Sequence, residues 1–303
     1  MSFNPEITDL SGKVILITGG TAGLGAGSIA ELAKLSPAHI FFSGRNQSKA
    51  DALIQKIEKA SPNVKITFIK ADISSLESVQ QAAETFLSQT DRLDILMLNA
   101  GIMAVAPGVS KDGYEIQFAT NHLGHALLVK KLLPTLLETA KHSDVRVINM
   151  TSLAYAQAPK EGVDFDTLQS PQASLGGLIP GPRWSRYGQS KLTQLLYSQQ
   201  LALHHPSITS VSIHPGIIMT GLFDDLPFLT VLPVLLMSLG KKTPVEQGHW
   251  NQCWAATAQK GNLTNGGYYE PTGVLTQPST KPGNDQKLAE RIWEWTEKAL
   301  EKY

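Results

Sequence analysis

The feature that most constrains this chain is the regular alternation of short apolar runs with longer segments of helical periodicity. Strands that alternate with helices favour crossover connections, which place the strands in a parallel sheet. Such strands are covered on both faces and should be apolar along their length, as are the runs at 14–17 (Val-Ile-Leu-Ile) and 95–98 (Ile-Leu-Met-Leu). We therefore predict an α/β fold of three layers, doubly wound, with a mainly parallel central sheet of about seven strands.

The expected elements follow one another from near the first residue to near the last. The strands are predicted at Val14–Ile17, Ile40–Phe42, Val64–Ile69, Leu93–Leu98, Val145–Met150, Ser210–His214 and Tyr268–Tyr269. The helices are predicted at Ser28–Leu35, Lys49–Lys59, Leu76–Leu87, Tyr114–Leu137, Tyr187–Leu203 and Leu288–Leu300.

No linker interrupts this pattern, so we expect residues 1–303 to form a single domain. Two irregular stretches stand out. The insert 157–183 is rich in Pro, Gly, Gln and Ser, and the loop 221–243 is apolar and contains prolines. Both follow the carboxyl end of a predicted strand, the edge at which open α/β sheets bind ligands.

Composition argues against several classes of function. Lys plus Arg number 26 and Asp plus Glu number 26, and this zero net charge argues against nucleic-acid binding. The single cysteine, Cys253, excludes an intrachain disulfide and a cysteine-based zinc site, and we expect an ordinary buried thiol on a helix. His122 and His125 share a helix face, but no third ligand accompanies them or His214, so no metal site is predicted.

No membrane segment is expected. The longest apolar stretch, 226–239, contains two prolines and is too short to cross a bilayer. The amino terminus has neither a basic start nor an apolar run, so it does not resemble a secretory signal. We therefore predict a soluble, cytoplasmic protein.

A glycine-rich segment at 18–25, Thr-Gly-Gly-Thr-Ala-Gly-Leu-Gly, follows the first predicted strand. Glycine at a strand-to-helix turn lets the backbone approach a phosphate, and the helix offers free N–H groups to that anion. The spacing is Gly-x-x-x-Gly-x-Gly rather than the commoner Gly-x-Gly-x-x-Gly, and a tight turn without a ligand is the alternative. The position after the first strand favours a dinucleotide site.

The end of the second predicted strand bears on the choice of cofactor. An acidic residue there would bind the adenosine ribose and select NAD, but the sequence has Arg45 instead. A guanidinium suits a 2′-phosphate, so we predict NADP rather than NAD, with a solvated surface arginine as the alternative. Asp72 and Asn99 follow the next two strands and should lie at the same edge, although each could be a simple turn residue.

A tyrosine and a lysine share one face of a predicted helix in Tyr187-x-x-x-Lys191. A nearby ammonium favours the phenolate and would lower the tyrosine pKa, but this pair alone arises easily by chance. Ser152 follows the fifth strand and Asn121 lies inside the long helix before it, while Pro215-Gly216 follows the sixth strand. Each of these three also has an ordinary structural interpretation as a cap, a buried amide or a turn.

In chain order these motifs resemble the short-chain dehydrogenase/reductase family over about 12–220. The segments Asn-His-Leu-Gly-His (121–125), Ser-Lys-Leu (190–192) and His-Pro-Gly (214–216) resemble its retinol-dehydrogenase-like branch. The segments at 266–273 and 293–297 resemble those of fungal members. The resemblance implies a Rossmann fold.

The resemblance also implies roles for particular residues. Tyr187 would exchange a proton with the substrate oxygen, Lys191 would lower the Tyr187 pKa and bind the nicotinamide ribose, and Ser152 would donate a hydrogen bond to the substrate oxygen. Asn121 would hold a water that links Lys191 to solvent. The residues implied to contact the cofactor, besides Tyr187 and Lys191, are Gly19, Thr21, Gly23, Leu24, Gly25, Arg45, Asp72, Ile73, Asn99, Gly101, Pro215, Ile218 and Thr220.

One departure from the family concerns the distance between serine and tyrosine. Many members have about a dozen residues there, whereas Tyr187 lies 35 positions after Ser152. The insert 157–183 must loop out, where it could reshape the substrate cleft or cover the dimerising helix face. Both a monomer and a homodimer therefore remain open.

The apolar character of 221–243 favours a hydrophobic small-molecule substrate, with packing on the sheet or an interfacial membrane contact as alternatives. The predicted function is NADP(H)-dependent interconversion of a carbonyl and an alcohol, mainly as a reductase. The alternatives are a C=C reductase, epimerase or dehydratase on the same fold, or a non-catalytic nucleotide-binding protein.

Overall fold

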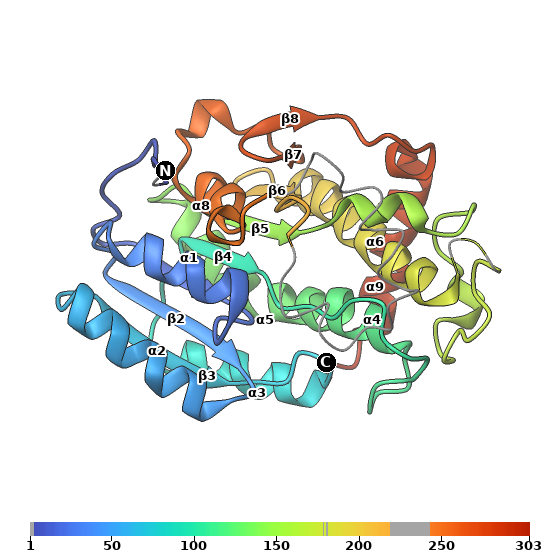
Figure 1. The fold of residues 1–303 in the computed structure, drawn as a ribbon, viewed down its shortest axis with the longest axis horizontal. Coiled ribbons are helices and arrows are strands. Elements are labelled where there is room, and N and C mark those ends of the chain that lie inside the picture. The colour runs from blue at the N-terminus through green and yellow to red at the C-terminus, as the bar shows by residue number, and fades with distance from the viewer. Residues whose placement is uncertain (1–2, 178, 180, 219–242) are drawn as a thin grey trace.

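The structure, a computed structural model, describes residues 3–177, 179, 181–218 and 243–303. Within them one sheet of eight strands has the order β3-β2-β1-β4-β5-β6-β7-β8. Neighbouring strands pair in parallel from β3 to β7, and β8 pairs antiparallel with β7. Figure 1 shows β3 and β8 at opposite edges of the molecule. The strands are β1 (Val14–Ile17), β2 (His39–Gly44), β3 (Lys65–Lys70), β4 (Ile95–Leu98), β5 (Arg146–Met150), β6 (Thr209–Ile213), β7 (Tyr268–Glu270) and β8 (Val274–Thr276).

Helices cover both faces of this sheet, and β1 shows how the sequence specifies them. Val14 and Leu16 point into one apolar cluster, whereas Ile15 and Ile17 point into the other. The first cluster includes side chains of α3, α5, α6 and α9, and the second includes those of α1, α2 and α8. The predicted three-layer, doubly wound arrangement is therefore confirmed. The helices are α1 (Gly23–Ala33), α2 (Gln47–Ala60), α3 (Leu76–Leu87), α4 (Ile116–Phe118), α5 (Gly124–Ala140), α6 (Pro182–His204), α8 (Trp250–Thr257) and α9 (Gln286–Ala299).

Three expectations need correction. The sheet has one strand more than predicted, because β8 is short and its residues Val274 and Leu275 are half exposed, so no continuous apolar run marks it. Helix α6 begins at Pro182, not at Tyr187; Gly181 has φ +93°, and proline suits the first position of a helix. The single long helix predicted from Tyr114 to Leu137 is divided into α4, a π-helical segment at Ala119–Leu123 and α5.

The sheet order places the candidate site. Strands β1, β4, β5 and β6 are neighbours and run in the same direction, so the loops after them meet at one edge. Between β1 and β4 the chain direction across the sheet reverses, which is where doubly wound sheets form a ligand crevice. Among the helices of the described ranges, none has the length and apolar character needed to cross a membrane.

Candidate active site

The glycine turn after β1 has a backbone that other residues could not easily adopt. Gly19 has φ +68°, in the left-handed region that favours glycine. A Cβ at Gly25 would collide with the carbonyl oxygen of Gly19 and lie 2.7 Å from Nδ2 of Asn99. The turn and the first residues of α1 therefore pack backbone against backbone, with no room for a side chain.

The amino end of α1 differs from those of α2, α3 and α9. Helices α2, α3 and α9 are preceded by Asn46, Ser75 and Asp285, whose side chains accept hydrogen bonds from the first free N–H groups. The residue at this position in α1 is Ala22, which makes no such hydrogen bond. The N–H groups at this helix end thus lack a side-chain acceptor, and an anion such as a pyrophosphate fits that need. The donor set here suits a dinucleotide.

The loops after β1 and β4 are joined by hydrogen bonds. Asn99 donates through Nδ2 to the carbonyl oxygens of Thr18 at 2.9 Å and Gly19 at 3.3 Å. The hydroxyl of Thr18 in turn accepts from the backbone N–H of Ala100 at 3.0 Å. The Asn99 amide therefore fixes the shape of the glycine turn, a contact that its position in the sequence did not predict.

The residues predicted near the adenosine lie around the ends of β2 and β3. Arg45 is exposed and directly follows β2. Thr21 lies close to Gly44, since a Cβ added at Gly44 would be 2.7 Å from the methyl group of Thr21. Asp72 accepts hydrogen bonds from the backbone N–H of Ser74 at 3.0 Å and from its hydroxyl at 2.7 Å. Ile73 packs its backbone against α5, where a Cβ at Gly124 would collide with the Ile73 carbonyl.

Ser152, Tyr187 and Lys191 come together past the carboxyl end of β5. Tyr187 is buried, and a hydrogen bond links its side chain to that of Ser152. Nζ of Lys191 lies 5.7 Å from the centre of the Tyr187 ring. The predicted convergence of hydroxyl, phenol and amine is therefore present in the structure.

The structure corrects the expected electrostatics of this group. We expected the Lys191 ammonium to lower the Tyr187 pKa. Instead, burial raises the Tyr187 pKa to about 12, and the hydrogen bond with Ser152 opposes that effect. Burial also lowers the Lys191 pKa to about 7, so this amine is a weak source of positive charge.

Lys191 is held by groups that the sequence did not identify. Its Nζ donates to the carbonyl oxygen of Met150 and to Oε1 of Gln194, both at 2.8 Å.

Asn121 lies in the π-helical segment. It accepts from the backbone N–H of Ile102 at 2.9 Å and donates to the Ile102 carbonyl oxygen at 3.0 Å. Its Nδ2 also donates to the Ser190 hydroxyl at 2.9 Å. Single π turns inside helices are frequent at functional sites.

Gly101 lies between these two side chains. A Cβ there would be 3.0 Å from Oδ1 of Asn121 and 3.7 Å from Nζ of Lys191. Asn121, Lys191 and the loop after β4 thus form one packed unit beside Tyr187.

His122, His125 and His214 are buried in the core of the protein. His122 contacts the Thr296 hydroxyl at 2.8 Å, and His125 contacts the Thr18 hydroxyl at 2.9 Å. Burial lowers the pKa of both to about 3 and that of His214 to about 4, so all three are neutral at physiological pH. The described ranges contain no group of three potential metal ligands. Cys253 is a buried helical thiol, as expected, and burial raises its pKa to about 12.

The remaining predicted residues follow β6. Pro215 is half-buried. Ile218 is buried close to Leu24, because a Cβ at Gly248 would lie 2.6 Å from the Ile218 side chain and 2.8 Å from the Leu24 side chain. Thr220 and nearly all of the loop 221–243 lie outside the described residues. Gln252, which sequence reasoning missed, donates to Oδ1 of Asn99 at 3.3 Å. No local spacing could have indicated it, because α8 is far away in the sequence.

Comparison with known proteins agrees with this architecture. A family model described as short chain dehydrogenase matches residues 13–163. The chain is 38% identical to an uncharacterized oxidoreductase, C736.13, of Schizosaccharomyces pombe, over 99% of this chain and 88% of that protein. It is 34% identical to the short-chain dehydrogenase/reductase drtF of Aspergillus calidoustus, over 98% of this chain and 96% of that protein. Both relatives are fungal.

Solved structures resemble the fold over most of its length. A 3-ketoacyl-(acyl-carrier-protein) reductase from Brucella melitensis, complexed with NADH, aligns with a TM-score of 0.65 at 22% identity, over 88% of this chain and 98% of that one. A blue fluorescent protein from a metagenomic library, complexed with NADPH, aligns with a TM-score of 0.63 at 25% identity, over the same shares. With the full-length sequence relatives, these findings establish that the chain belongs to the short-chain dehydrogenase/reductase family of oxidoreductases.

Proposed function

We propose that this chain is an NADP(H)-dependent oxidoreductase that interconverts a carbonyl and an alcohol on a hydrophobic small molecule, mainly as a reductase. The observation that carries this proposal is the buried Tyr187 phenol, joined to Ser152 and beside Lys191. Burial raises its pKa to about 12, so the phenol is protonated at neutral pH, as an unperturbed tyrosine also is. A protonated hydroxyl held beside the substrate oxygen would act as the general acid in reduction.

The cofactor would lie across the crevice between the loops after β1 and β4. The amino end of α1 would hold the pyrophosphate, with Gly19, Gly23, Leu24 and Gly25 along it. Asp72, Ile73, Asn99 and Gly101 flank the path toward Tyr187, and Thr21 lies near the adenosine end, beside Gly44 at the end of β2. Pro215, Ile218 and Thr220 would border the nicotinamide. When bound, the cofactor supplies the hydride, and the protein supplies orientation and the proton.

The protein's chemical task is the transfer of one proton. In reduction the Tyr187 hydroxyl gives its proton to the substrate oxygen, while the Ser152 hydroxyl holds that oxygen by a hydrogen bond. Lys191, with a pKa lowered to about 7, can gain and lose a proton near neutral pH. Asn121, which like Lys191 lies beside Gly101, would hold a water that links Lys191 to solvent.

The surroundings of Tyr187 support an apolar substrate. Met103, Ala104 and Trp184 form a small buried cluster with Tyr187, and the Trp184 and Tyr187 rings meet edge to face at 6.0 Å between centroids. Apolar walls around a few polar groups are typical of sites for hydrophobic ligands.

The test is a reduction assay on the purified protein. NADPH or NADH is mixed with a panel of aliphatic ketones, aromatic ketones, aldehydes and enones, and loss of reduced nicotinamide is followed by absorbance. We expect turnover of ketones or aldehydes, and product analysis of enones should show the C=C bond intact. Cofactor binding without turnover of any compound would contradict the proposal, and saturated products would favour a C=C reductase.

The cofactor preference depends on Arg45. We expect Arg45→Asp to lower kcat/KM for NADPH relative to NADH by about tenfold or more, because a carboxylate repels the 2′-phosphate. The control is Lys49→Asp, which makes the same charge change at another exposed position on α2. An unchanged ratio in Arg45→Asp would show that Arg45 is only a surface residue.

A further inference from the structure

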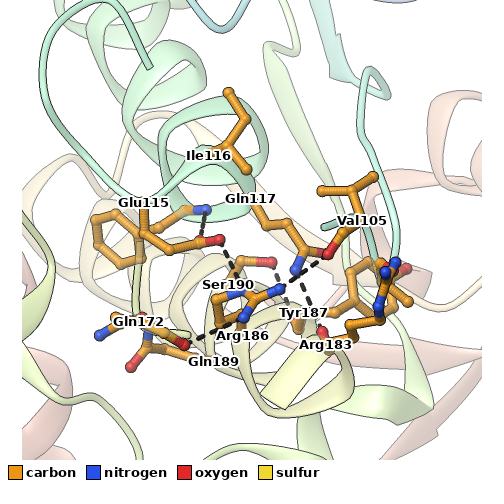
Figure 2. A network of polar contacts seen from close by, with 12 residues as sticks. Val105, Glu115, Ile116, Gln117, Gln172, Arg183, Arg186, Tyr187, Gln189 and Ser190 are labelled. Carbon is orange, nitrogen blue, oxygen red and sulfur yellow. Dashed lines mark hydrogen bonds and ion pairs between the residues drawn. The ribbon is translucent and has the colours of Figure 1, made fainter. Parts of the chain in front are cut away.

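A buried ion pair lies directly beside the catalytic group. Arg186 precedes Tyr187 on α6, and Glu115 lies just before α4; both side chains are 0% exposed, and Nε of Arg186 is 3.1 Å from Oε1 of Glu115 (Figure 2). Removing two charges from water is costly, and apolar side chains of similar volume often give equal or better stability. Such a pair therefore calls for an explanation other than stability.

The remaining donors of Arg186 reach two further segments. Nη1 donates to the carbonyl oxygen of Gln172 in the insert at 3.1 Å. Nη2 donates to the carbonyl oxygen of Val105, in the loop after β4, at 2.8 Å. Figure 2 shows the guanidinium between these partners and Glu115. One side chain thus joins α6, the start of α4, the insert and the loop after β4.

Neighbouring contacts run along the same face of α6. Gln189, one turn beyond Arg186, accepts from the backbone N–H of Asp164 at 2.9 Å and donates to Oε1 of Gln172 at 2.8 Å. Arg183, one turn before it, donates to the carbonyl oxygen of Ala104 at 3.1 Å. The insert and the loop after β4 are therefore fastened to the helix segment that carries Tyr187.

The loop after β4 is the segment of this network that contacts Tyr187. Ala104 has φ +49°, a conformation unfavourable for a residue with a side chain. Surrounding contacts must hold it, and these include the hydrogen bonds from Arg183 and Arg186 to the carbonyls of Ala104 and Val105. Met103 and Ala104 then pack against Tyr187.

The position of Arg186 on its helix gives a second argument. The amino end of a helix carries a partial positive charge, so cations there oppose the dipole. Arg183 and Arg186 both lie near the amino end of α6, which begins at Pro182. Neither gains from the helix dipole, and Glu115 supplies the compensating charge for Arg186.

We propose that Arg186, paired with Glu115, is a positioning residue that holds the insert and the loop after β4 against the α6 segment carrying Tyr187, and thereby fixes the shape of the substrate cleft. This inference rests on the proposed function, since it concerns how that site selects and orients its substrate. Arg186 acts through Tyr187 and Met103 and touches neither substrate nor cofactor.

The test compares Arg186→Met with Arg146→Met. Arg146 is a matched control because it is also buried, pairs with Asp144 at 2.6 Å, and donates to the carbonyl oxygens of Ala255 at 2.9 Å and Ala258 at 2.6 Å, at the opposite end of β5. Steady-state kinetics with NADPH and the ketones that wild type reduces, cofactor titration, and amide hydrogen exchange of peptides from 157–183 and 102–108 are measured for both.

We expect Arg186→Met to lower kcat by about tenfold to a hundredfold, because small misplacements of reacting groups are costly. KM should rise more for bulky ketones than for small ones, cofactor Kd should stay within about twofold of wild type, and exchange should rise in both peptides. Arg146→Met should lower the melting temperature but leave kcat and these peptides unchanged. Equal behaviour of the two variants, or wild-type kinetics in Arg186→Met, would overturn the inference.

Two further variants keep the test decisive if Arg186→Met does not fold. Arg186→Lys keeps the charge but cannot reach all three acceptors, and Glu115→Gln keeps the shape but removes the charge. Each should raise exchange of the insert and the KM for bulky ketones, and normal values in both would refute the positioning role. If wild type reduces no carbonyl compound, the proposed function fails, but the exchange comparison still decides whether Arg186 holds the two segments.

Discussion

Two buried arginines lie at opposite ends of the same part of the sheet. Arg146 begins β5 and binds the last carbonyl oxygens of α8, at Ala255 and Ala258, where a cation complements the helix dipole. Arg186 lies beyond the other end of β5, near the amino end of α6, where a cation opposes the dipole. Each arginine has an acidic partner, but only Arg146 is also favoured by a helix dipole, that of α8, whose last carbonyl oxygens it binds.

The same contrast holds for the two edges as a whole. At the amino edge, the buried Asp94 carboxylate accepts from the backbone N–H of Val14 at 2.9 Å and from Arg92 at 2.8 Å. At the carboxyl edge, the amino end of α1 lacks a side-chain cap, and an amine and a phenol are buried together. The amino edge is built for stability. We infer that the unfavourable features retained at the carboxyl edge serve a bound ligand or a reaction.

Among the paired comparisons of the two edges, the largest effect is expected for Ser152→Ala, which tests whether the carboxyl edge is catalytic. Loss of the hydroxyl should lower kcat by about a hundredfold to a thousandfold, because it removes a donor to the substrate oxygen. Steady-state kinetics provide the measurement. Ser143→Ala is the control at the amino edge, where the Ser143 hydroxyl donates to Asp94 at 2.5 Å. It should lower stability without changing kcat, and a similar loss of kcat in both would erase the contrast.

A smaller effect is expected for Gly25→Ala. The added Cβ collides with the Gly19 carbonyl, so the phosphate-binding turn must shift, and cofactor Kd should rise by about tenfold to a hundredfold. Cofactor titration by fluorescence measures this. The control is Gly12→Ala, just before β1, where φ is +74° but no atom lies within 4 Å of the added Cβ. Equal cofactor Kd values in the two variants would show that the glycine turn is not part of the cofactor-binding site.

At the amino edge, Asp94→Asn should lower the free energy of unfolding by about 2 kcal/mol while leaving turnover intact. Burial raises the Asp94 pKa, but hydrogen bonds from Arg92, Ser143 and Val14 outweigh it and hold the pKa below its usual value. The carboxylate therefore contributes stability above the unfolded pKa of about 4, and this contribution is lost as the pH falls below it. Denaturant titrations of both proteins should converge in acid. A difference independent of pH would contradict this assignment.

The smallest effect concerns the helix caps. Asp285 accepts hydrogen bonds from the backbone N–H groups of Lys287 at 3.0 Å and Leu288 at 3.1 Å, so Asp285→Ala should cost about 1 kcal/mol. Thermal unfolding gives the stability, and cofactor titration should show no change. Weaker cofactor binding in Asp285→Ala would show that a helix end far from the crevice affects the cofactor site, contrary to this expectation.

The sequence predicted those features that local patterns encode. Apolar runs located β1 to β7, because strands buried on both faces need them, and the motif order located Asn121, Ser152, Tyr187 and Lys191. Strand β8 was missed because its half-exposed residues carry no apolar run. These local patterns do not identify the substrate, because a substrate would contact loops, such as the one after β4, rather than the strands that the patterns predict.

Contacts between distant segments were beyond prediction. The pairs Arg186–Glu115 and Gln252–Asn99 join residues with no common motif, and only the folded sheet brings them together. The Tyr187 pKa illustrates the same point for energetics. Sequence spacing indicated the nearby lysine, but the burial that dominates the shift depends on the packing of Met103 and Trp184.

The most direct test of the central claim measures both the turnover of Tyr187→Phe and its affinity for the cofactor. The variant loses the phenolic proton but keeps the ring that packs against Met103 and Trp184. We predict loss of carbonyl reduction by a factor of about a thousand or more, with cofactor Kd and melting temperature close to wild type. Carbonyl reduction at the wild-type rate in Tyr187→Phe would contradict it.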